Sequence, residues 1–228
     1  MLDLDISGER KLATAAVGIL DKVAEAYRAR QKARAEEFFK FVDLRYENMS
    51  VSEQAEFNGY VESEAGQDVL VDYVDGILRT SCKRARMAIA LLYCQDYEFN
   101  FNHVEIRSFI SSMQSINDDL LNFFMMASAL STKEGGVGVS ESTERYPYPR
   151  AKIDSGNRKT FHDKGWDTEA IFINTNELIT LRLLLPDPAI NPVMGGDGSY
   201  WYVGFGVTNT SQKIASLIRK AESLIPAA

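Results

Sequence analysis

Residues 202–218 read YVGFGVTNTSQKIASLI, and this stretch decides the fold of the C-terminal half. Apolar side chains fall at every second position, at Trp201, Val203, Phe205 and Val207, which predicts a half-buried strand. The run Thr-Asn-Thr-Ser at 208–211 supplies capping side chains for a helix, and apolar residues then recur at helical spacing at Ile214, Leu217, Ile218, Ala221, Leu224 and Ile225. The stretch therefore predicts the second strand of a hairpin followed by an amphipathic closing helix.

The two glycines of this stretch also match the start of a dinucleotide-binding fingerprint. Asn209 stands where that fingerprint requires a third glycine, and the strand before it belongs to a hairpin instead of a parallel βαβ unit. The sequence contains neither a P-loop nor a G-x-S-x-G nucleophile motif. The tripeptide that begins at His103 lacks the P-C-x-x-C of a zinc deaminase and fits the first turn of a capped helix. We therefore expect no nucleotide, cofactor or metal site.

The composition favours a folded protein without a membrane segment. The chain has 228 residues, enough for one large domain or two small ones, and 45% of them are hydrophobic. No apolar run approaches the roughly 18 residues that a membrane span needs, and the N-terminus lacks the apolar stretch of a signal peptide. Cys82 and Cys94 fall in one helical pattern, about 18 Å apart at 1.5 Å per residue, too far for a disulfide. Free thiols fit a cytoplasmic location, which we expect.

The net charge of −7 is unevenly distributed. Segment 43–75 contains nine acidic side chains and one basic side chain, Arg45. Basic residues gather elsewhere in three clusters, Arg28/Arg30/Lys32/Arg34, Arg79/Lys83/Arg84/Arg86 and Arg150/Lys152/Arg158/Lys159. These charges fit either solvated helix faces or a match, within one chain or between subunits, of the acidic segment to the basic clusters.

Helical patterns account for much of the first 130 residues, although none is assigned to 47–67. A helix is expected from Ser7 to about Tyr46, apolar near its two ends and charged in its middle. Further helices are expected over 68–80, over 83–95 as a central buried helix, from the Asn102 capping box, and from Ser115 or Asn117 with two aspartates in its first turn. We expect a helical region at 1–98 and a second domain at 99–228.

The second domain is expected to be winged-helix-like. Its glycines and prolines predict a long flexible loop at 131–166, and AIFI at 170–173 predicts a short strand. A capping box at Asn174 predicts the start of a helix that ends before Pro186, followed by an extended segment at 190–194, a GGDG turn at 195–198 and the second hairpin strand. The expected fold class is therefore mainly α with a small β-hairpin.

This arrangement resembles the bacterial Abi-alpha family, which is associated with abortive infection and phage defence. The resemblance covers residues 66–228 and is carried by VDYVDGILRTSCKRARMAIALLY (71–93), FNHVEIRSFISSMQSINDDLLNFF (101–124), NTNELITLRLLL (174–185) and the opening stretch. It implies helices ending in a winged helix and transfers no catalytic residue.

Three functions follow as expectations. The first is a non-enzymatic protein-interaction module of a phage-defence or stress system, which binds a protein partner or a second copy through the long N-terminal helix and the acidic segment. The second is a winged-helix DNA-binding regulator reading DNA with Thr175, Asn176, Glu177, Thr180 and Arg182, a face that holds a single basic residue and is poorly equipped for phosphate contacts. The third is an enzyme that uses His162 and Asp163 beside the loop.

Overall fold

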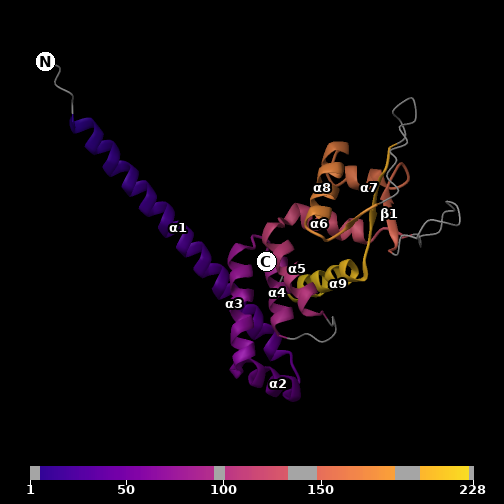
Figure 1. Cartoon of the computed structure of the whole chain (residues 1–228), viewed down its shortest axis with the longest axis horizontal. Coiled ribbons are helices and arrows are strands. Elements are labelled where there is room, and N and C mark those ends of the chain that lie inside the picture. The colour runs from indigo at the N-terminus through magenta and orange to yellow at the C-terminus, as the bar shows by residue number, and fades with distance from the viewer. Residues whose placement is uncertain (1–5, 95–100, 133–147, 188–200, 226–228) are drawn as a thin grey trace.

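The computed structural model describes residues 6–94, 101–132, 148–187 and 201–225. These residues form mostly helices and one small antiparallel sheet (Figure 1), as the expected fold class required. In chain order the elements are α1 (Ile6–Glu47), α2 (Val51–Glu62), α3 (Glu64–Arg79), α4 (Lys83–Tyr93), α5 (His103–Ser115), α6 (Asp118–Ser128), β1 (Arg150–Ile153), α7 (Arg158–His162), α8 (Thr168–Thr180), β2 (Leu185–Pro186), β3 (Val203–Gly206) and α9 (Asn209–Leu224).

The long N-terminal helix has two different halves. Its C-terminal half packs against α3 and α4, where Phe38 is fully buried. Its N-terminal half extends away from the rest of the molecule (Figure 1), and Val23 and Tyr27 on it are exposed. The acidic segment forms the end of α1, all of α2 and most of α3.

Helix α4 is the centre of the core. All of its residues from Ala85 to Tyr93 are buried, which confirms the expected central helix. The ring of Tyr93 is surrounded by four others, from Phe38, Phe57, Tyr60 and Tyr73. Helix α9 packs along α4, so one hydrophobic core runs across the expected boundary between residues 98 and 99. Both cysteines are buried thiols at the ends of α4 and form no disulfide.

The caps expected for α5 and α6 are present. The Asn102 side chain accepts from the backbone N–H groups of Val104 and Glu105, and the Glu105 carboxylate accepts from the backbone N–H of Asn102. Asn117, one of the two expected start residues, caps α6 by accepting from Leu120. Such caps depend on neighbours within four residues, which is why the sequence alone predicts them.

Three expectations for residues 131–180 are wrong. The range 131–166 is not a single loop, because β1 and α7 lie within it; residues 133–147 lie outside the described part of the chain. AIFI is not a strand, and Asn174 does not open the helix: α8 begins at Thr168, where Asp167 accepts from the Ala170 N–H. A short apolar run has no distinguishing period, and the helical assignment agrees with the buried residues Ile171, Thr175 and Leu178, which recur at spacings of four and three.

The small sheet has the order β1-β3-β2. The second strand of the expected hairpin is present as β3, but β3 pairs with Leu185–Pro186 (β2) at one edge and with β1 at the other, both antiparallel. As the middle strand, β3 is buried at every position, so the expected half-buried strand is wrong in its burial. The expected extended segment at 190–194 and turn at 195–198 lie outside the described residues. Thr208 caps α9, forming a capping box with Ser211.

The first glycine of the GFG sequence has a packing role. A Cβ at Gly204 would collide with the carboxylate of Asp187, which is buried and accepts from Arg150 Nη2 at 2.6 Å. Gly204 therefore leaves room for an ion pair that joins β1 to the end of β2.

Candidate functional site

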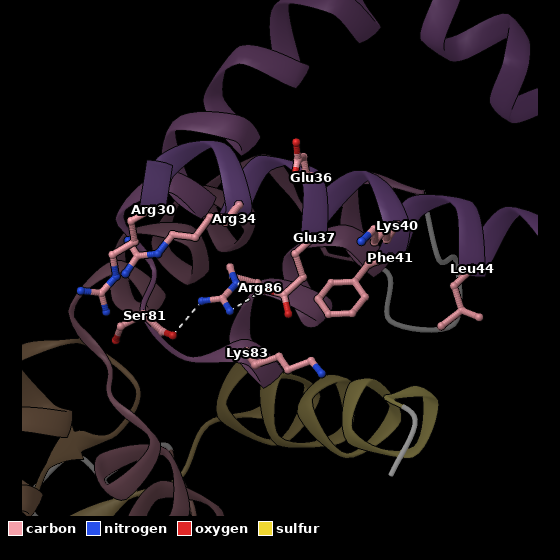
Figure 2. A pocket seen from close by; sticks show the side chains of 11 residues that line it. Arg30, Arg34, Glu36, Glu37, Lys40, Phe41, Leu44, Ser81, Lys83 and Arg86 are labelled. Atoms are coloured by element: carbon pink, nitrogen blue, oxygen red, sulfur yellow. Dashed lines mark hydrogen bonds and ion pairs between the residues drawn. The ribbon is translucent and has the colours of Figure 1, made fainter. Parts of the chain in front are cut away.

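An open cleft of about 730 Å³ lies at the base of α1, where this helix crosses the junction of α3 and α4 (Figure 2). Its lining is rich in charge. Five cationic side chains stand against two carboxylates, with one serine and three apolar residues completing the wall: Arg30, Arg34, Lys40, Lys83 and Arg86; Glu36 and Glu37; Ser81; Ala33, Phe41 and Leu44. We call this the basic cleft.

Arg86 fixes the floor of the basic cleft. Its Nε and Nη2 atoms lie 2.7 and 2.5 Å from one carboxylate oxygen of Glu37 on α1. Its Nη1 atom donates to the carbonyl oxygens of Thr80 and Ser81, at 3.0 and 2.7 Å. The residue is only 8% exposed, and these bonds engage all three of its nitrogens. Arg86 therefore ties α1 to the α3–α4 junction and has a structural role.

Arg34 lies about one helical turn before Glu37 on α1, and one of its nitrogens is fixed by a hydrogen bond. Its Nη1 atom donates to the carbonyl oxygen of Leu78 at 2.5 Å. Burial, followed by repulsion from Arg30 and Arg86, lowers the pKa of the Arg34 guanidinium. The cations of the cleft are thus close enough to repel one another.

Three further cations, Arg30, Lys40 and Lys83, line the basic cleft. Among the residues that the structure describes, Arg30, Lys40 and Lys83 form no ion pair. Lys83 is the first residue of α4, and the side chain of Cys82 before it makes no capping hydrogen bond. The positive end of the helix dipole therefore adds to the positive charge of the basic cleft.

The basic cleft has two chemically different ends. In Figure 2, Arg30, Arg34 and Ser81 lie at one end, and Phe41 and Leu44 lie at the other, where Lys40 is drawn beside Phe41. Such a surface has the means to bind an anion beside an apolar group. Its one side-chain hydroxyl, that of Ser81, donates to the Ile116 carbonyl oxygen at 3.4 Å.

The candidate catalytic residues of the sequence lie elsewhere, on and after α7. His162 and Asp163 are both exposed. The Nδ1 atom of His162 lies 2.9 Å from the carbonyl oxygen of Trp166, and Asp163 pairs with Lys159 one turn earlier. Each therefore has a local partner, and the structure does not bring the two together as a base and its orienting acid. In the described residues no group of three or more His, Cys, Asp and Glu side chains is arranged to hold a metal.

The candidate DNA-reading residues do not share one surface. Thr175 is fully buried and donates to the Ile171 carbonyl oxygen, so its inclusion in a reading face is wrong. Asn176, Thr180 and Arg182 are exposed. Arg182 follows the end of α8 with a φ of 60°.

The exposed apolar side chains of α8 were missed by the sequence reasoning. Phe172 and Ile173 are 40% and 54% exposed, and Glu169 and Glu177 are exposed on the same helix. The ring of Phe172 lies 5.4 Å from that of Trp201. Because residues 170–173 were expected to form a strand, the sequence did not predict an exposed apolar side of helix α8.

The basic cleft combines two clusters that the sequence already distinguished. Arg30 and Arg34 belong to the first basic cluster, and Lys83 and Arg86 to the second. The expected match of these clusters to segment 43–75 is limited in the described residues to the surface pair Arg79–Asp75. Because the clusters are about fifty residues apart, only the packing of α1 across the α3–α4 junction brings them together.

Comparisons of the chain with protein-family models, curated proteins and solved structures find no match. Among the described helices, none is both long enough and apolar enough to cross a membrane.

Proposed function

We propose that the chain is a non-enzymatic protein-interaction module whose N-terminal helix α1 is the docking element. One observation carries the proposal: Val23 and Tyr27 are 59% and 62% exposed on the part of a 42-residue helix that extends beyond the body (Figure 1). A helix without tertiary contacts is marginal in water. A partner that covers its apolar side stabilises it.

The sequence of this arm supports a helical partner. Small and apolar residues recur at alternating spacings of four and three, at Leu12, Ala16, Ile19, Val23 and Ala26. This is the spacing of a coiled-coil seam. The seam ends where Arg30 begins the basic cleft. A second copy of the chain carries the same seam and is the partner we propose, because a two-fold interface pairs like surfaces.

Light scattering of the purified chain over a concentration series tests this proposal. We expect a dimer that the substitution Val23→Asp converts to a monomer, because a carboxylate in an apolar seam is desolvated without a partner. Val71→Asp is the matched control, since Val71 on α3 is 66% exposed and lies off the arm. A wild-type chain that stays monomeric at all concentrations contradicts the proposal, and so does a Val23→Asp variant that remains dimeric.

The proposed module has a winged-helix-like C-terminal region that serves protein contact. The order α6, β1, α7, α8, β2, β3 and the antiparallel sheet support this arrangement. The exposed side of α8 carries Phe172, Ile173 and carboxylates. DNA affinity depends on neutralising phosphates with Lys and Arg, so the surface favours a protein partner. A mobility shift with genomic fragments at low salt that is abolished by Arg182→Ala supports the DNA-binding alternative instead.

The proposed pathway, bacterial phage defence, rests on the resemblance to the Abi-alpha family. Its test is the plating efficiency of phages on bacteria that express the chain. Protection that Val23→Asp abolishes and Val71→Asp retains connects the pathway with the arm, whereas equal plating with and without the chain contradicts it.

A further inference from the structure

We propose that the basic cleft binds a small organic molecule that carries phosphate groups. The inference is independent of the docking role of α1, because the basic cleft lies at the base of this helix and its lining begins at Arg30, beyond the apolar seam.

The balance of charge in the basic cleft calls for an anion. The protein as a whole carries a net charge of −7, yet five cations and only two carboxylates line this one concavity. Glu37 forms an ion pair with Arg86, and Oε1 of Glu36 lies 3.8 Å from Nζ of Lys32. A concave surface lined by one sign of charge focuses the field and attracts ions of the opposite sign.

The donors at the cationic end suit phosphate oxygens. Arg30 and Arg34 are one turn apart on α1, so their side chains leave the same face of the helix, and Figure 2 draws them together beside Ser81. Guanidinium groups bind phosphates through paired N–H donors. Lys83 stands at the N-terminus of α4, where helix geometry itself favours a phosphate.

The free donors are held on a rigid frame. Arg86 is buried and fully engaged by Glu37, Thr80 and Ser81, and one nitrogen of Arg34 is anchored on Leu78. Burial and then repulsion from Arg30 and Arg86 lower the pKa of Arg34, and an anion at this end relieves that repulsion. The floor of the basic cleft and one nitrogen of Arg34 are therefore fixed before a ligand arrives, whereas Arg30 and Lys83 are exposed side chains.

The size and the apolar end favour an organic phosphate. The volume of about 730 Å³ falls within the range of roughly 300–1,000 Å³ that small-molecule sites occupy. Phe41 and Leu44 provide an apolar wall for the uncharged part of the ligand. A nucleotide combines phosphates with an aromatic base whose faces pack on apolar side chains.

Titration calorimetry of the full chain at low salt tests the site with four probes: ATP, inorganic pyrophosphate, adenosine and a poly-glutamate peptide. We expect ATP to bind, pyrophosphate to bind more weakly, and adenosine and the peptide not to bind. Raising the salt concentration should weaken both interactions, because each depends on charge.

Variants locate the binding. Arg30→Ala combined with Lys83→Ala removes two exposed cations without a described partner, and we expect it to weaken ATP binding at least about tenfold while the far-ultraviolet circular dichroism stays unchanged. Arg28→Ala is the matched control, since Arg28 is exposed on the same helix and does not line the basic cleft. The Val23→Asp variant should bind ATP as the wild type does, which separates this test from that of the docking role.

Four results overturn the proposal. They are the absence of binding by both phosphate probes, equal binding of adenosine and ATP, binding of the peptide in place of ATP, and equal loss of affinity in the double variant and in Arg28→Ala. If the double variant is unfolded, Arg30→Ala alone serves, and unchanged ATP affinity in that variant is then the overturning result.

Discussion

Replacing Arg86 by leucine removes the contact that joins α1 to the centre of the molecule. The guanidinium group is buried and bonds to the Glu37 carboxylate and to two backbone carbonyl oxygens at the end of α3. In Arg86→Leu these three acceptors lose their donors in a place that water reaches poorly. Breaking a buried ion pair from one side costs about 3–5 kcal/mol. Because the side chain of Glu37 is 26% exposed and regains some water, we expect a loss at the lower end, about 3 kcal/mol.

Urea and thermal unfolding followed by circular dichroism measure this loss. For a chain of this size 1 kcal/mol corresponds to about 2–4 °C in Tm, so we expect Tm to fall by about 9 °C. Glu37→Gln should cost much less in the Arg86→Leu background than in the wild type, with a coupling free energy of about 1 kcal/mol or more.

A surface ion pair provides the control for Arg86→Leu. Arg79 and Asp75 are one turn apart on α3, with side chains 68% and 66% exposed. We expect Arg79→Ala to change the free energy of unfolding by less than about 0.5 kcal/mol. If Arg86→Leu lies within that same limit, or if Glu37→Gln costs the same in both backgrounds, the contact does not hold α1 as we have argued.

Three further substitutions test the packing. Gly76→Ala places a Cβ 2.5 Å from Cγ2 of Ile110; despite the better helix propensity of alanine, calorimetry should report a loss of about 1–2 kcal/mol, and a gain contradicts the tight α3–α5 contact. Gly204→Ala displaces the Asp187 carboxylate, and we expect a loss of about 2 kcal/mol in urea unfolding; unchanged stability argues against the buried ion pair. For Glu105, burial raises the pKa, but hydrogen bonds and a nearby lysine outweigh it and lower the pKa overall. The carboxylate therefore stabilises the fold above its unfolded pKa of about 4.3, and Glu105→Gln should lose about 1 kcal/mol at pH 7. This difference from wild type should shrink as the pH falls below about 4; a difference independent of pH contradicts the assignment.

Local signals in the sequence predicted the elements whose boundaries depend on neighbouring residues. The capping box at Asn102, the cap at Asn117 and the buried stretch of α4 are present as expected. Local signals failed at α8, because a four-residue apolar run fits a strand and a helix equally well and Asn174 lies in the middle of the observed helix. They failed at β1 because that strand is defined by its pairing with residues 203–206, about fifty positions away.

The candidate site was also predicted only in part from the sequence. Composition and spacing identified the two basic clusters and the absence of the common nucleotide and hydrolase motifs. They did not indicate that Arg30 and Lys83 line one cleft, since charge patterns carry no information on which helices cross. The sequence also did not predict that Thr175 is buried.

The sequence by itself determined that this protein is mainly helical, where α4, α5, α6 and α9 begin, and that its first helix is long and charged in the middle. These properties follow from side-chain periodicity and hydrogen bonds within one turn, which act over a few residues. The tertiary structure decided which charges are neutralised and which are left facing a cavity. It did so because Arg86 pairs with Glu37 across 49 positions of the chain, and that contact brings a basic surface of α1 against the start of α4.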